Sequence, residues 1–155
     1  MTELLANHLG GQWTLGSGPG TPLFDPVLGD ELVRVDATGL DLAAGFAFAR
    51  EQGGAALRAL SYRQRGELLG AVAKLLQSRR DEYHAISTAN SGTTQADSGV
   101  DVDGAIYTLS TYARLAAQLP DGAVLPDGEA LSLAKDGSFA TRHVQVPTGG
   151  LALFI

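Results

Sequence analysis

Apolar side chains recur at helical spacing in the middle of the chain, where one stripe is formed by Leu68, Leu69, Val72, Leu75 and Leu76. This spacing predicts an amphipathic helix that packs on a core. Ser61 and Gln64 precede the stripe at the spacing of a capping box, in which each side chain satisfies a free backbone amide of the first turn. The helix is therefore expected to begin directly after Ser61.

Two arginines interrupt that stripe. A continuing helix would bury Arg79 and Arg80, and burial of charge without a partner is unfavourable. We therefore predict a break at this point, with Asp81 as the cap of a further helix. That helix should end near Gly92, since glycine commonly closes a helix in the left-handed conformation.

A third helical pattern follows a polar segment. Residues 93–99 are predicted to form a loop, and the apolar positions after them have helical spacing: Val102, Ile106, Leu109, Ala113 and Ala116. Asp101 and Asp103 would then lie at the start of the helix, where the dipole favours negative charge. The turn residues 119–122 are expected to end it.

The N-terminal part of the chain predicts a hairpin and one more helix. Residues 21–24 and 31–35 read as strands, joined by a turn that contains Pro26 and Gly29. A helix is expected from Asp41, with its end at Gly53 and Gly54.

The C-terminal part predicts strands. Residues 130–134 and 138–146 flank Asp136-Gly137, a strong hairpin signal, while residues 125–128 are expected to form an irregular connection. Residues 151–155 form an uninterrupted apolar run, typical of a parallel strand covered on both faces. Such a strand needs neighbours and a continuation, so we expect the sequence to be a segment of a longer protein.

Composition and charge narrow the class of protein. The 155 residues, 45% hydrophobic and 18% charged, are typical of one globular domain or part of one. The net charge of −6 and the absence of a basic stripe disfavour nucleic acid and anionic membranes as partners. No stretch approaches the roughly 20 apolar residues of a membrane helix, and the N-terminus has no leader-like pattern, so a cytoplasmic protein is expected.

The chain offers little catalytic or metal-binding chemistry. It has no cysteine, which excludes disulfides, thiolate metal sites and thiol nucleophiles. His8, His84 and His143 lack the paired spacing of metal ligands, so we predict surface or structural roles and no metal site. The glycine-rich residues 16–20 are predicted to be a plain loop, because no apolar strand precedes them and no helix follows.

Carboxylates and serines give no catalytic constellation either. Asp101 and Asp103 are two positions apart, so on a helix they point in different directions. Ser87, Ser91 and Ser98 lack the Gly-x-Ser-x-Gly pattern of a nucleophile elbow. We therefore expect no catalytic residue in this chain.

Several motifs, taken in order, resemble the start of aldehyde dehydrogenases. They are Leu9-Gly10-Gly11-Gln12-Trp13, Phe24-Asp25-Pro26, Ala55 with Leu57-Arg58, Ser61-Tyr62-Arg63-Gln64-Arg65, and Ala89-Asn90-Ser91-Gly92-Thr93-Thr94. Residues 97–105 and 133–139 are more specific. They resemble the branch of this family that acts on CoA-thioester semialdehydes in aerobic degradation of aromatic compounds.

The resemblance implies an α/β fold of which this chain is the N-terminal portion. The helical part of the cofactor domain would span about residues 37–118, an oligomerisation-type β-hairpin about 130–146, and the first strand of a Rossmann-like cofactor domain 150–155. The parent enzyme would be a homodimer or homotetramer. Phe154 and Ile155 would approach the nicotinamide of the cofactor through backbone atoms.

The resemblance also implies a mechanism. In this family a cysteine thiolate attacks the aldehyde, hydride passes to NAD or NADP, and a glutamate assists hydrolysis of the thioester. The chain stops before the positions of that cysteine, that glutamate and the asparagine that helps bind the oxyanion. It would then be an inactive scaffold segment of a longer enzyme that oxidises a small-molecule, CoA-linked aldehyde. The alternative is a non-catalytic remnant or interaction module, although an exposed apolar edge strand disfavours a stable soluble monomer.

Overall fold

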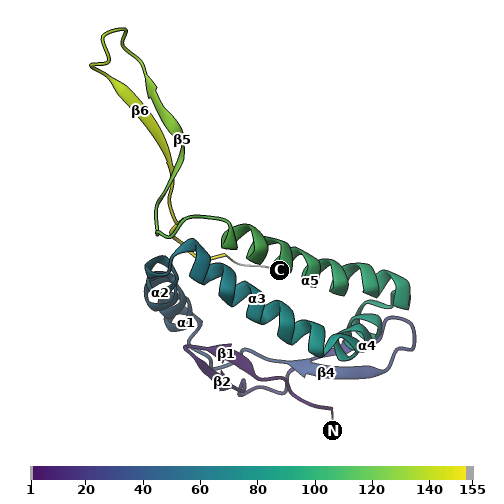
Figure 1. Ribbon diagram of the computed structural model, residues 1–155. Helices are drawn as coiled ribbons and strands as arrows, with labels where there is room; N and C mark the ends of the chain where they lie inside the picture. The colour runs from purple at the N-terminus through teal and green to yellow at the C-terminus, as the bar shows by residue number, and fades with distance from the viewer. Residues whose placement is uncertain (1, 153–155) are drawn as a thin grey trace.

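The computed structural model describes residues 2–152, which form three two-stranded antiparallel hairpins and a layer of helices (Figure 1). The elements in chain order are β1 (Asn7–Leu9), β2 (Gln12–Thr14), β3 (Thr21–Phe24), β4 (Glu31–Val35), α1 (Leu42–Phe48), η1 (Ala49–Gly53), α2 (Gly54–Ala59), α3 (Tyr62–Ser78), α4 (Arg80–Ser91), α5 (Gln95–Ala117), β5 (Leu125–Ser132) and β6 (Ala140–Gln145).

Helices α3 and α5 pack against each other along small residues. The Cα of Gly66 lies so close to α5 that a methyl group there would overlap the Ala116 methyl, and a methyl on Gly70 would lie 3.6 Å from that of Ala113. The start of α3 therefore lies beside the end of α5, and the two helices run antiparallel. Ala73 of α3 and Ile106 of α5 are buried in this layer. Helix α4 lies against α5 and completes what we call the helical layer, α3 to α5.

The predicted start of α3 is confirmed. Gln64 N donates to Ser61 Oγ at 3.2 Å, and Ser61 N donates to Gln64 Oε1 at 2.9 Å, which completes the capping box. The predicted break is also confirmed, at Arg79. Asp81, however, is not the cap of the next helix, because α4 begins at Arg80 and Asp81 lies inside its first turn. Gly92 ends α4 with φ of 65°, as expected.

The predicted loop at residues 93–99 is too long, since it ends at Thr94. Helix α5 begins at Gln95, and Thr94 caps it by accepting a hydrogen bond from Asp97 N. Because the helix starts six residues before Asp101, neither Asp101 nor Asp103 lies at its N-terminus. Asp97 is the acidic residue of the first turn.

The predicted helix end at Gly53 and Gly54 is wrong as well. Both glycines have right-handed helical φ values, −61° and −63°. The chain passes from α1 through the π-helical turn η1 directly into α2, which ends at Ala59. Glycine permits a left-handed end, but it does not force one.

The hairpin β3–β4 is confirmed with the predicted boundaries. The hairpin β1–β2 was not predicted, because each strand has three residues and the sequence signals only the turn between them. Gly10 and Gly11 occupy that turn with φ of 58° and 83°.

Strands β5 and β6 form a hairpin that projects away from the helices, here called the arm, residues 125–145 (Figure 1). The predicted hairpin, about residues 130–146, begins too late in the sequence, so its first strand is too short. Leu125, Pro126 and Asp127 pair with β6, so the expected irregular connection at 125–128 is part of β5. The pairing register shifts between Asp127 and Leu131, which places the irregularity inside the strand.

The strand predicted at the C-terminus is not present in the described residues. Gly150, Leu151 and Ala152 have no strand assignment, and residues 153–155 lie outside the described part of the chain. The proposed cofactor contacts Phe154 and Ile155 are among the latter. Among residues 2–152, no helix has both the length and the apolarity required to span a bilayer.

Candidate functional site

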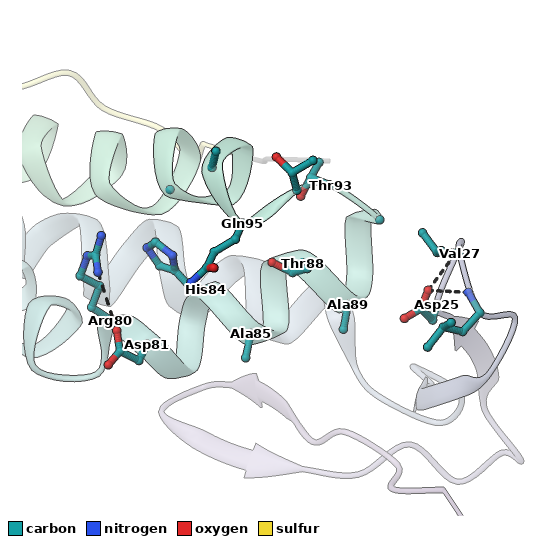
Figure 2. A pocket seen from close by; sticks show the side chains of 15 residues that line it. Asp25, Val27, Arg80, Asp81, His84, Ala85, Thr88, Ala89, Thr93 and Gln95 are labelled. Atoms are coloured by element: carbon teal, nitrogen blue, oxygen red, sulfur yellow. Dashed lines mark hydrogen bonds and ion pairs between the residues drawn. The ribbon is translucent and has the colours of Figure 1, made fainter.

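A pocket of about 1120 Å³ lies between the β3–β4 turn and the helices α4 and α5 (Figure 2). Its lining includes Asp25, Val27, Arg80, His84, Thr88 and Gln95. The pocket thus joins a turn near the N-terminus to residues that follow it by more than fifty positions. A reaction site would need polar groups that are free to act on a substrate, so its chemistry depends on the hydrogen-bond partners of the polar groups around the pocket.

Arg80 and Asp103 form a bidentate ion pair beside the pocket. Arg80 Nε donates to Asp103 Oδ1 and Nη2 donates to Oδ2, each at 2.6 Å. His84 Nε2 lies 3.3 Å from Asp103 Oδ1. The hydrogen bonds from Arg80, and secondarily from His84, lower the pKa of Asp103 from 3.8 to about 2.

These contacts define what Asp103 does. Its lowered pKa keeps the carboxylate ionised, and both of its oxygens are already held by Arg80, so it is poorly suited to accept a proton from a substrate. The expectation that Asp103 serves the start of α5 is wrong. It fastens α4 to α5 instead. His84, nearly fully buried, has the structural role predicted for the histidines.

Hydroxyl groups form a chain between α4 and the start of α5. Ser98, which is fully buried, lies 3.0 Å from Thr88 and 2.8 Å from Thr93, measured between hydroxyl oxygens. Ser91 Oγ lies 2.9 Å from Thr93 Oγ1. Among the described residues, the Ser98 hydroxyl contacts the hydroxyls of Thr88 and Thr93 and not a histidine, so the arrangement lacks the nucleophile and base pair of a serine hydrolase. The cluster closes the junction of two helices.

The β3–β4 turn, which forms one wall of the pocket, also has a structural role. Asp25 is buried, and its Oδ1 accepts hydrogen bonds from the amides of Val27 at 2.8 Å and Leu28 at 2.9 Å. Gly92 faces this turn, since a methyl group on it would lie 2.8 Å from Pro26 Cγ. Sequence reasoning recognised the turn and Gly92 separately, but it had no signal that they meet.

No metal centre is formed by the described residues, which contain no group of three or more histidine, cysteine, aspartate or glutamate side chains suitably placed. His8 packs edge-on against Trp13, with ring centroids 5.0 Å apart. His143 is exposed on β6.

The glycine-rich residues 16–20 do not fit a dinucleotide phosphate. Gly18 N donates to Asp36 Oδ2 at 2.6 Å, so the loop amide is used by an internal carboxylate. Hydrogen bonds from the Thr38 hydroxyl, and then from Gly18 N, lower the pKa of Asp36. A phosphate group would meet this negative charge, and no helix N-terminus follows the loop to offset it. The segment is a plain connection between β2 and β3, as predicted.

Comparison with known proteins shows which family the chain resembles. Residues 13–152 match the aldehyde dehydrogenase family. The chain is 48% identical over 151 residues to 3,4-dehydroadipyl-CoA semialdehyde dehydrogenase of Aromatoleum evansii, a match that covers 97% of this chain and 29% of that protein. The fold resembles that of an NAD-dependent benzaldehyde dehydrogenase from Corynebacterium glutamicum, with a TM-score of 0.65 and 19% identity over 80% of this chain and 27% of that one. The chain thus spans less than a third of the length of these relatives.

Proposed function

Since the chain belongs to the aldehyde dehydrogenase family, we propose that it is the N-terminal part of an NAD(P)-dependent dehydrogenase of a CoA-linked semialdehyde. The proposed substrate is 3,4-dehydroadipyl-CoA semialdehyde, an intermediate of aerobic aromatic degradation. The observation that supports this substrate is the 48% identity over nearly the whole chain with a dehydrogenase of that name. We propose that this reaction takes place in the cytoplasm.

The role of the chain in that reaction is to provide scaffold. Its sequence contains no cysteine, so the thiolate of the family mechanism must come from another part of a longer polypeptide. The polar groups beside the pocket whose contacts were described above, Asp25, Arg80, His84 and Ser98, are engaged with other groups of the chain. The chain on its own is therefore proposed to be inactive.

Each part of the chain would have its own place in the longer enzyme. Residues 37–118 would be the helical part of the cofactor domain, residues 150–155 its first strand, and Phe154 and Ile155 would approach the nicotinamide through backbone atoms. NAD or NADP, bound mainly by residues elsewhere, would accept the hydride. The arm would join subunits into a homodimer or homotetramer, since its paired strands project from the helices and leave two free edges (Figure 1).

The substrate is tested with a chimera that joins residues 1–155 to the remaining sequence of the Aromatoleum evansii relative. We expect the chimera to reduce NAD+ or NADP+ with 3,4-dehydroadipyl-CoA semialdehyde and to prefer it over benzaldehyde. The isolated chain should give no turnover with either. Equal turnover of both aldehydes by the chimera would contradict the assignment of substrate.

A second candidate is a non-catalytic interaction module on the same scaffold. The observation in its favour is that no nucleophile and base are paired within residues 2–152. A chain that remains monomeric, fully folded and resistant to protease without any added partner would support this module and oppose the fragment of an enzyme.

A further inference from the structure

A groove of about 490 Å³ lies between α3 and α5. Glycine on α3 lets the two backbones approach closely there, since a methyl group at Gly66 would overlap that of Ala116. We call this site the α3–α5 groove. Its charged lining residues are Arg63, Glu67, Lys74 and Arg114, and the others are small: Gly66, Gly70, Ala71, Ala113 and Ala117.

The charge of the groove is opposite to that of the whole chain. Its lining contains three cations and one carboxylate, whereas the complete chain has a net charge of −6. Arg63 and Lys74 belong to α3 and Arg114 belongs to α5, so the packing of two helices brings these cations together. The sequence shows no basic run at any of them. A local excess of positive charge on an acidic protein attracts anions.

The three cations are accessible to a ligand, since each is exposed. Arg63 Nε lies 3.4 Å from Asp121 Oδ1, but both side chains are on the surface, where an ion pair contributes little and can exchange for another anion. Within residues 2–152, Lys74 and Arg114 form no ion pair with a carboxylate. Burial of such charges without partners is unfavourable, so we expect the groove to lie on the surface of the longer enzyme.

We propose that the α3–α5 groove binds the phosphate groups of the coenzyme A moiety of the substrate. Coenzyme A carries phosphate at two places, a pyrophosphate and a 3′-phosphate, so cations spread along a groove suit it better than they suit a single phosphate. Arginine binds phosphate oxygens through paired N–H donors, and lysine binds them as a compact charge. The small side chains between the cations leave room for the adenosine.

Binding at this groove acts on substrate affinity and not on the chemical step. The nucleotide end of coenzyme A is joined to the aldehyde by a long flexible arm, so it contacts the protein far from the reacting carbon. Contacts of this kind are equally strong in the ground state and the transition state, and therefore lower KM without raising kcat. The choice of ligand rests on the proposed function, whereas the charge of the groove does not.

Calorimetric titration of the chain with coenzyme A tests the site. Lys74→Gln and Arg114→Gln should each weaken binding about threefold, and Glu67→Gln should strengthen it by about the same factor, because Glu67 repels the phosphates. Lys135→Gln is the matched control. Lys135 is exposed in the turn that joins β5 and β6, outside the groove, and its replacement should leave the affinity unchanged. Equal losses for Lys74→Gln and Lys135→Gln would overturn the site.

Related ligands test the choice of coenzyme A. Dephospho-coenzyme A lacks the 3′-phosphate and should bind about threefold more weakly, and added salt should weaken both ligands. NADP+ and inorganic phosphate should bind more weakly than either. If NADP+ or inorganic phosphate binds as tightly as coenzyme A, the groove is an unselective anion site and the proposal is wrong.

The chimera described above separates the groove from the proposed function. With both Lys74→Gln and Arg114→Gln, its KM for 3,4-dehydroadipyl-CoA semialdehyde should rise about tenfold while kcat changes little. Turnover with an unchanged KM would refute the groove and leave the proposed function intact. Coenzyme A binding that depends on Lys74 and Arg114, in a chimera without turnover of this aldehyde, would support the groove and refute the proposed substrate.

Discussion

Arg80 on α4 holds Asp103 on α5 through two hydrogen bonds, each 2.6 Å long, although the two residues are 23 positions apart. Planar guanidinium and carboxylate groups match in this geometry, which fixes orientation as well as distance. His84, one turn along α4, approaches the same carboxylate. The pair therefore sets how the second and third helices of the layer meet.

Replacement of Asp103 tests this role. Asp103→Asn removes the charge that Arg80 and His84 share, and we expect a clear fall in the thermal unfolding midpoint of the chain. Asp101→Asn is the matched control, since Asp101 is an exposed residue of the same helix, and it should leave the midpoint nearly unchanged. Equal effects of the two substitutions would show that Asp103 is not the fastening point.

The acid response follows from the lowered pKa of Asp103. A carboxylate whose pKa is about 2 in the folded chain and 3.8 ordinarily contributes stability above pH 3.8, and this contribution disappears as the pH falls towards 2. Urea unfolding between pH 5 and pH 2 should show the decline. In Asp103→Asn the decline should be shallower, and parallel curves for the two proteins would refute the assignment.

Gly66 and Gly70 of α3 give a paired test of helix packing. A methyl group at position 66 would overlap Ala116, so Gly66→Ala should cost about 1–3 kcal/mol in the free energy of unfolding through overpacking. Gly70→Ala places a methyl group 3.6 Å from that of Ala113, an ordinary contact, and should be neutral or stabilising by up to about 1 kcal/mol through higher helix propensity. Denaturant titration of both variants would reveal the order, and the reverse order would contradict the close approach.

Gly92 is constrained both by its backbone and by its neighbours. Its φ is 65°, and a methyl group on it would lie 2.8 Å from Pro26 Cγ, so Gly92→Ala should destabilise the chain by about 1–3 kcal/mol. Gly104→Ala, in the interior of α5 with nothing within 4 Å of the added methyl group, should stabilise by about 0.5–1 kcal/mol. The two unfolding midpoints should move in opposite directions. A neutral Gly92→Ala would mean that the β3–β4 turn can move away from α4.

Local signals in the sequence predict much of this fold. Ser61 and Gln64 cap a helix with atoms three residues apart, and Pro26 with Gly29 forms a turn within one short segment. The predicted family and the α/β fold of its N-terminal portion are confirmed by the match of residues 13–152 and by the fold comparison.

The predictions that were wrong have two causes. Either two local signals competed, or a contact with a distant part of the chain decided the outcome. Thr94 and Asp101 both stand before apolar positions at helical spacing, and the sequence does not show that Thr94 caps the helix. Gly53 is compatible with a left-handed helix end as well as with a helical turn, and the neighbouring residues decide which of the two conformations forms. Asp103 was assigned a role from its own helix because its partner Arg80 belongs to another.

The candidate site was least accessible to prediction. Its pocket is assembled from the β3–β4 turn, α4 and the start of α5, so no single segment carries its pattern (Figure 2). The absence of cysteine was the one sequence feature that bore directly on chemistry, and it excludes a thiolate nucleophile within this chain.

The base of the arm is tied to the beginning of α3. Tyr62 N donates to the carbonyl oxygen of Gly122 at 3.2 Å, and Arg63 Nε lies 3.4 Å from Asp121 Oδ1. The eight-residue strand β5 is about 27 Å long, so a rotation of roughly 10° at this attachment moves its far end by about 5 Å. The arm is thus attached to the first turn of a helix that lies sixty residues earlier in the sequence. A small rotation of that turn would therefore produce a larger displacement of the strand edge at the far end of the arm.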